Sequence, residues 1–346
     1  MFEVLKGYYH RHFTDPEAVV LALFLLVSFL FLFFFGEMLA SVFAALVIAF
    51  ILEWLVNKLE GLHMRRGYAI AIVYFGFLSI LAFTVFFLLP LLWQQIIHLI
   101  EEMPGMISHW QQQLLLLPVY YPELISEQQI NDFIDTMRPQ MVHYGQRVLS
   151  YSGTLVPLFA GVVVYFVLLP LMIFFMLKDR DLITHWVLSF LPRDRRLIEN
   201  VWDEVYGQFG NYVRGKVAEV LIVGIVSWIL LAFMGLNYAG LIASIIGVSV
   251  LVPYVGPIVA TIPLAVVAYF QWGWGMNFFY VVVGYGVLQA LDGNVLVPIL
   301  FSEVVNLHPL AIIIAVIFFG ALWGVWGVFF SIPLAILIKA VINAWP

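Results

Sequence analysis

Long apolar runs without charged residues dominate the chain, and they predict transmembrane helices. A helix that crosses the hydrocarbon core of a bilayer needs about 20 apolar residues. Continuous runs favour helices over a membrane barrel, whose strands alternate in segments of about ten residues. The clearest runs cover residues 18–35, 38–52, 68–93, 154–177 and 217–236. We therefore expect an all-α polytopic membrane protein, with the third run ending at Pro90.

Beyond Gly235 the apolar pattern is broken by proline and glycine as far as Ile338. The run at 239–252 would make a helix of only about 21 Å, short of a hydrocarbon core of about 30 Å. Pro253, Gly256 and Pro257 follow it, and proline cannot continue the helical hydrogen bonds. The sequence predicts a broken helix here, and an even number of spans favours a kinked crossing over a hairpin.

A second interruption follows at residues 292–298, with Gly293 and Pro298 inside it. Its pentapeptide Asn-Val-Leu-Val-Pro resembles Ser-Val-Leu-Val-Pro at 249–253. Unwound backbone is tolerated at membrane depth only where protein buries it or it lines a cavity. Paired interrupted helices are typical of transporter binding sites, although a plain proline kink would explain each break alone.

Two stretches are too polar to span a membrane. Residues 94–152 are expected to form amphipathic helices, and the stretch at 178–216 contains a helix expected to lie along the membrane surface before it enters the fifth span. Seven Lys and Arg residues lie in 178–216 but only Arg138 and Arg147 in 94–152. The positive-inside rule therefore puts both termini in the cytoplasm and 94–152 outside.

The expected organisation has five parts. These are a three-span segment at 1–93, the extracytoplasmic helical segment at 94–152, a fourth span at 153–177, the cytoplasmic stretch at 178–216, and a C-terminal transport core at 217–346.

Composition agrees with a membrane protein and narrows the partners. Hydrophobic residues make up 64% of the chain and charged residues 10%, whereas soluble domains have about 45–50% and about 25%. The formal net charge of −6 gives no reason to expect nucleic acid as a partner. The chain has no cysteine, which excludes thiol chemistry and thiolate metal sites. We expect no cofactor and no metal site.

Between residues 217 and 338 the chain has no Lys or Arg, and its only carboxylates are Glu219, Asp292 and Glu303. A carboxylate at membrane depth costs about 2.5–3.5 kcal/mol on insertion scales, which favours a functional role. Asp292 is the strongest candidate, because it lies in the second interruption. The alternative is an acid at a helix end that faces water.

The sequence predicts that Asp292 binds a proton or a cation, with Glu219 as a second candidate. Asn294 and the carbonyl groups freed near Pro253 and Pro298 are expected to hold the cargo.

Gly320, Gly324 and Gly327 lie in the last long apolar run, which is expected to form one helix. Small residues at this spacing let helices approach closely, so we expect these glycines to pack against a neighbouring helix within or between subunits.

Several motifs in this order resemble the autoinducer-2 exporter (AI-2E) family. They are Tyr212-Val-Arg-Gly-Lys216, Gly235-Leu-Asn237, Pro253-Tyr-Val-Gly-Pro257, Leu291-Asp-Gly-Asn-Val-Leu-Val-Pro298 and Leu307-His-Pro309. The resemblance implies eight membrane segments, an extracytoplasmic helical insert, broken hairpins in the C-terminal half and homo-oligomers. It also implies transport, since members are described as exporters of autoinducer-2 or as cation/proton antiporters. The position of Asp292 often carries Glu in this family.

The leading hypothesis is a secondary transporter in the inner (plasma) membrane. Without a P-loop motif, ATP has no recognisable site, so an H⁺ or monovalent-cation gradient or the solute's own gradient would drive transport. A passive channel is the alternative within transport, and a membrane scaffold or regulator that docks a partner on 94–152 is another. An enzyme is not expected, since the His-x₄-Asp spacing at His10 and Asp15 stands alone.

Overall fold

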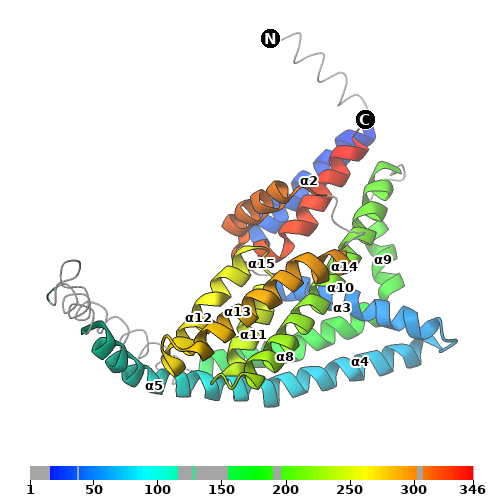
Figure 1. Cartoon of the computed structure of the whole chain (residues 1–346). Helices are drawn as coiled ribbons and strands as arrows, with labels where there is room; N and C mark the ends of the chain where they lie inside the picture. Colours follow the sequence, from blue (N-terminus) through cyan, green and yellow to red (C-terminus); the bar gives the residue numbers. More distant parts are fainter. Residues whose placement is uncertain are drawn as a thin grey trace, which may run out of the picture.

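The computed structural model describes residues 16–36, 39–115, 128, 155–189, 196–301 and 307–345, and nearly all of them are helical (Figure 1). The elements are α2 (Pro16–Phe35), α3 (Ala40–Glu60), α4 (Arg66–Phe83), the π-helical turn η1 (Thr84–Leu88), α5 (Leu89–Leu115), α8 (Leu155–Lys178), α9 (Arg180–Ser189), α10 (Arg196–Phe233), α11 (Ala239–Ser249), α12 (Val255–Trp272), α13 (Met276–Leu291), the π-helical turn η2 (Asp292–Leu296), α14 (Val297–Phe301) and α15 (Pro309–Ala344). The outer segment at 94–152 is described only as far as Leu115 and at 128, and His10, Asp15 and Glu303 lie outside the described residues.

Six helices in the described residues are long and apolar enough to cross a membrane. They are Ser41–Glu60, Arg66–Met103, Leu197–Phe233, Val255–Trp272, Met276–Phe301 and Trp326–Ala344, and shorter apolar helices accompany them. Large apolar side chains face outward on them, as Phe75 does with 66% of its surface exposed and Phe87 with 67%. Only lipid solvates such a surface, so the chain is a multi-pass α-helical membrane protein as expected. The count of eight crossings remains a prediction.

Helix α10 lies at the centre of the C-terminal half. It joins the predicted surface helix and the predicted fifth span into one helix of 38 residues. Its N-terminal part packs against other helices, and its predicted place along the membrane surface stays a prediction. Val201 is buried beside Ala340 of α15, and Val213 is buried with Val47 of α3 and Ile332 of α15. Protein therefore covers part of the apolar stripe of this segment, while Trp202, with 64% of its surface exposed, faces outward.

Helices α11 and α12 form a hairpin, which corrects the expected kinked crossing. Gly235, with φ of +74°, turns the chain after α10, and α11 runs back along α10. At the open end of the hairpin, the side chain of Gln271 donates to the carbonyl of Gly235 at 2.8 Å and accepts from the amide of Asn237 at 2.7 Å. The end of α12 thus returns to the start of α11, a long-range contact that counting spans does not detect.

A pair of glycines permits the close packing of α11 on α10. A Cβ atom at Gly247 would lie 3.0 Å from the Cα of Gly224 and 3.0 Å from the carbonyl oxygen of Val220. Real Cβ contacts are rarely so short, so a larger residue would push the two backbones apart. This contact sets the height at which the tip of the hairpin, residues 250–254, meets α10.

Two prolines that were expected to interrupt helices are instead accommodated by π-helical turns. The turn η1 ends two residues before Pro90, and η2 ends two residues before Pro298. Proline lacks an N–H and crowds the carbonyl four residues earlier, and the wider π turn, with the amide of residue i bonded to the carbonyl of i−5, relieves this conflict. Pro90 therefore does not end the third span, and the α-helix continues to Leu115 (Figure 1).

The last apolar run is a helical hairpin rather than the single helix that was expected. Trp323 and Gly324 leave the helical conformation, Gly324 with φ of +58°, and the chain reverses there. A Cβ atom at Gly327 would lie 1.8 Å from the carbonyl oxygen of Phe319, and one at Gly320 would meet the side chain of Val328 at 2.9 Å. The three glycines thus form the turn of α15 and the close contact beside it.

A buried carboxylate connects the helices of the N-terminal half. Glu53 of α3 accepts hydrogen bonds from Arg66 of α4 at 3.0 and 3.2 Å and from Arg180 of α9 at 2.9 Å. Arg66 also donates to the carbonyl of Leu177 at the end of α8 at 3.1 Å. One acid therefore holds the ends of α3, α4, α8 and α9 together.

We expect Glu53→Gln to lower the free energy of unfolding by about 1–3 kcal/mol, because two guanidinium groups lose the charge that they surround. Glu60→Gln is the matched control, since Glu60 is more exposed and contacts only Arg66 among these arginines, at 3.3 Å; its effect should stay within about 1 kcal/mol. Thermal unfolding of the detergent-solubilised variants measures both, and equal shifts would contradict the role given to Glu53.

Candidate functional site

A cavity of about 380 Å³ lies where the two interrupted segments meet the middle of α10. Its walls come from α10, the tip of the α11–α12 hairpin, the end of α13, η2, α14 and both halves of α15. The lining residues are Tyr212, Lys216, Glu219, Val250, Val252, Pro253, Tyr254, Pro257, Gln289, Asp292, Gly293, Val297, Phe301, Ile312 and Ile332. Most are apolar or aromatic, so the few charged groups share an environment in which charges interact strongly.

Helix α10 presents Lys216 and Glu219 on one face, because residues three apart lie one turn above each other. Both side chains are buried, with 7% and 3% of their surfaces exposed. The ring of Phe301 packs onto α10 where Gly215 has no side chain; a Cβ atom there would approach the ring to 2.6 Å. This contact places the Phe301 ring 5.5 Å from the ammonium of Lys216, within the range of a cation–π interaction.

The ammonium of Lys216 joins α10 to the hairpin tip. Its Nζ donates a hydrogen bond to the carbonyl oxygen of Val250 at 2.8 Å. The same atom lies 2.7 Å from Oε2 of Glu219 as an ion pair. This distance is that of a charge-assisted contact between an ammonium and a carboxylate. The lysine thus compensates the charge of Glu219, and the carboxylate keeps further acceptor positions for a ligand.

Asp292 begins the π-helical turn η2, and its side chain is directed into the cavity. Only 7% of the residue is exposed, so it is not an acid that simply faces water. Its Oδ1 has no hydrogen-bond partner among the described residues. Carboxylates at Asp292 and Glu219 against one ammonium at Lys216 give the lining a formal charge of −1 when all three are ionised.

The tip of the hairpin has an unusual backbone. Tyr254 has a φ of +63°, a backbone conformation that residues other than glycine rarely adopt. The next glycine, Gly256, lies directly on the end of α11, where a Cβ atom would come within 1.7 Å of the carbonyl oxygen of Ser249. A hydrogen bond from the Tyr285 hydroxyl to the carbonyl oxygen of Pro257, at 2.7 Å, ties α13 to the start of α12.

The structure brings together most of the residues that the sequence singled out. Five line this cavity: Glu219, Pro253, Pro257, Asp292 and Gly293. Gly256 lies beside them in the hairpin tip.

Asn294 and Pro298 do not line the cavity. Asn294 is exposed, and its side-chain amide donates to the carbonyl of Ala290 at 2.8 Å. Pro298 is also exposed. Their expected roles in holding cargo remain predictions, and this conformation places them elsewhere.

Lys216 and Tyr212 belong to the first of the family motifs, but the sequence did not predict a place for either of them in the site. Lys216 stands at the edge of the apolar run and was counted as a charge that orients the chain. Its position three residues before Glu219 is a signal of an ion pair on a helix. Tyr212 lies one turn earlier on the same face and is almost completely buried.

Near the hairpin's open end, a second cavity of about 540 Å³ is lined by residues of α5, the 237–238 turn and α12. Gln95 of α5 accepts from the amide of Leu241 at 2.8 Å. Burial and the neighbouring carboxylate of Glu102 raise the pKa of Tyr238 to about 12. The start of the predicted outer segment therefore packs against the end of the hairpin opposite to its tip.

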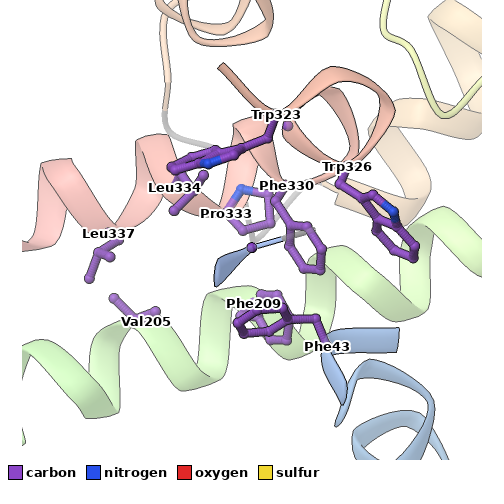
Figure 2. A pocket seen from close by; sticks show the side chains of 11 residues that line it. Phe43, Val205, Phe209, Trp323, Trp326, Phe330, Pro333, Leu334 and Leu337 are labelled. Carbon is purple, nitrogen blue, oxygen red and sulfur yellow. The ribbon is translucent and has the colours of Figure 1, made fainter. Parts of the chain in front are cut away.

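A third cavity, of about 260 Å³, lies between α10, α3 and α15 and is apolar (Figure 2). Figure 2 shows Val205 and Phe209 of α10 facing Pro333, Leu334 and Leu337 of α15. No charged side chain lines it, so it offers no site for an ion. Across the described ranges, no group of three or more acidic, histidine or cysteine side chains comes together to hold a metal.

The bundle with its apolar outer surface defines a multi-pass helical membrane protein, with a broken hairpin and buried charges inside it. Comparison with known proteins identifies the family. Residues 20–346 match the AI-2E family transporter, and the chain belongs to this family.

Relatives match over nearly the whole length of the chain. It is 47% identical to a protein of Escherichia coli strain K12 named "Putative permease PerM", over 100% of this chain and 98% of the relative. It is 24% identical to the "Putative transport protein YueF" of Bacillus subtilis strain 168, over 97% of this chain and 93% of the relative.

We expect Gly256→Ala to disrupt the hairpin tip, because a Cβ atom would collide with the backbone of Ser249 rather than with a side chain that can move. The thermal unfolding midpoint should fall clearly below that of the wild type. Gly286→Ala on α13 is the matched control, since a Cβ atom there meets nothing within 4 Å, and alanine is favoured over glycine in a helix by roughly 0.5–1 kcal/mol. Equal midpoints for the two variants would contradict the tight contact at the tip.

Proposed function

We propose that the chain is a secondary transporter that moves a small solute or ion across the inner (plasma) membrane, coupled to H⁺ or to a monovalent cation. The observation that carries this proposal is the cavity at the break between α11 and α12, which holds one lysine and two carboxylates in a mostly apolar wall. Membership of the AI-2E family supports transport as the class of activity.

The formal charge of the cavity predicts that the site binds a single positive charge. Two carboxylates and one ammonium leave one negative charge without a partner, and an unpaired buried charge is costly. One proton or one monovalent cation makes the site neutral. Asp292 is the group that receives it, because its Oδ1 has no hydrogen bond among the described residues and Lys216 is already paired with Glu219. Glu219 completes the site from α10.

The hairpin is the element that moves. Side chains hold its tip through the bond from Lys216 to the Val250 carbonyl and the bond from Tyr285 to the Pro257 carbonyl. A change in the charge of the cavity acts directly on the first of these bonds. Binding of a proton or a cation at Asp292 therefore shifts the balance between two positions of the tip, as alternating access requires.

The proposed orientation puts both termini in the cytoplasm and the segment at 94–152 outside, following the distribution of Lys and Arg. The hairpin then enters from the outer face. Lys216 lies 17 residues from the end of α10 at Phe233, about 26 Å along the helix. The outward-facing apolar side chains contact the lipid bilayer, and assembly into homo-oligomers, which the family resemblance implies, belongs to the same proposal.

We expect Asp292→Asn to abolish gradient-driven flux. Asparagine has the shape of aspartate, but its neutral amide takes up no proton and has no negative charge to compensate a bound cation. Purified chain in proteoliposomes is tested with an imposed pH gradient and then with an imposed Na⁺ gradient. The variant should lose at least about tenfold in rate, equivalent to about 1.4 kcal/mol. Its elution volume in size-exclusion chromatography should be that of the wild type.

Asp203→Asn is the control, because Asp203 is an exposed carboxylate on the same helix as Glu219 and lies outside the cavity. It should transport at the wild-type rate. Normal flux in Asp292→Asn would remove Asp292 from the mechanism. Solute flux that ignores both gradients would indicate a passive channel, and no flux of any kind would favour a scaffold or regulator.

A further inference from the structure

We propose that Lys216 is a tethered cation: its ammonium occupies a binding position for a monovalent alkali cation, formed by the Val250 carbonyl oxygen and the Glu219 carboxylate. The free cation and the lysine compete for this position. The inference rests on the proposed function and adds to it the place where an alkali cation binds.

The two oxygens around the ammonium have the chemistry of an alkali-ion site. The Nζ atom lies 2.8 Å from the Val250 oxygen and 2.7 Å from Glu219 Oε2. None of the backbone hydrogen bonds described in the turn at 250–256 goes to the Val250 oxygen, which is left over where α11 ends. The C-terminal end of a helix carries a partial negative charge, and such ends and unwound carbonyls coordinate Na⁺ in transporters with broken helices.

The groups that face this position come from each element packed around it. From α10 they are Glu219 and the hydroxyl of Tyr212, and from η2 the carboxylate of Asp292. From α14 the face of the Phe301 ring lies 5.5 Å away. No arginine and no second lysine lines the cavity. The other charged groups of the lining are thus both acids. The position therefore favours a cation, whether it is the lysine ammonium or a free ion.

Competition follows from the charge count. With Lys216 in place the lining has a formal charge of −1, and without its ammonium the two carboxylates carry −2. A cavity of about 380 Å³ has room for an ion and water. Removing the lysine charge therefore creates a strong site for a free cation where the wild type holds a tethered one.

The test measures binding of alkali cations to the purified full-length chain carrying Lys216→Met, which keeps most of the side-chain volume but not the charge. NaCl, KCl and LiCl are compared with choline chloride at equal ionic strength by the thermal unfolding midpoint, and radiolabelled Na⁺ is followed by equilibrium dialysis. We expect Lys216→Met to half-saturate at a concentration roughly tenfold or more below that of the wild type for at least one alkali cation.

Two variants serve as controls. Lys216→Arg keeps the charge and should respond no more strongly to alkali cations than the wild type. The double variant Lys216→Met with Glu219→Gln lacks the carboxylate charge of the site, since the Val250 carbonyl is neutral, and it should lose the response gained in Lys216→Met. A folded Lys216→Met chain that responds to the alkali salts no more than the wild type does overturns the proposal.

The folding of the Lys216→Met chain in different salts is a second readout of the proposal. A Lys216→Met chain that folds in an alkali salt but not in choline chloride supports the proposal, because the free cation then replaces the ammonium. A chain that fails to fold in all three alkali salts, while Lys216→Arg folds, overturns it.

The outcome is separable from that of the transport proposal. Flux that depends on Asp292, together with no alkali-cation response in Lys216→Met, overturns the tethered cation and leaves transport standing. A strong alkali-cation response in Lys216→Met, together with no flux in the wild type, supports the tethered cation and overturns the transport proposal.

Discussion

The ammonium of Lys216 hydrogen-bonds a carbonyl oxygen that has no backbone donor in its own turn, because α11 ends at Ser249 and Tyr254 takes a positive φ. In water such a carbonyl would be solvated, but at membrane depth it needs a partner from the protein. The partner is charged, so the same contact that completes the broken helix also brings a cation beside Glu219. This one contact joins the hairpin tip to the helix that carries Glu219, and the cavity lies where the two meet.

Prolines interrupt the regular helix in two different ways in this fold. Before Pro90 and Pro298 a π-helical turn keeps the chain helical. At Pro253 the helix stops, the chain reverses, and carbonyl groups are left for side chains to satisfy. Asp292 opens one of the π turns beside the broken hairpin, so a continuous helix presents an acid to an interrupted one.

The charged groups of the two halves serve different purposes. In the N-terminal half Glu53 is surrounded by two arginines that also reach solvent, with 31% and 42% of their side chains exposed. With Glu60, which also pairs with Arg66, that cluster has two acids and two arginines, and it holds the helix ends together. In the C-terminal cavity the acids outnumber the single lysine and all three groups are buried, so the cluster gains from one more cation. Each acid of the N-terminal cluster is paired with an arginine, whereas the cavity has one more carboxylate than ammonium groups.

The sequence by itself determined the class of the protein and the break at Pro253, and it marked Asp292 as the leading site candidate, because hydrophobic run length, proline chemistry and the cost of buried charge are local properties. It did not determine that α11 and α12 form a hairpin, since this depends on Gly247 meeting Gly224 and on Gln271 reaching Gly235. It likewise left Lys216 among the charges that orient the chain. Only the tertiary structure brought Lys216 onto the carbonyl of Val250, 34 residues away, because such a contact depends on how the helices pack and not on the pattern of either segment.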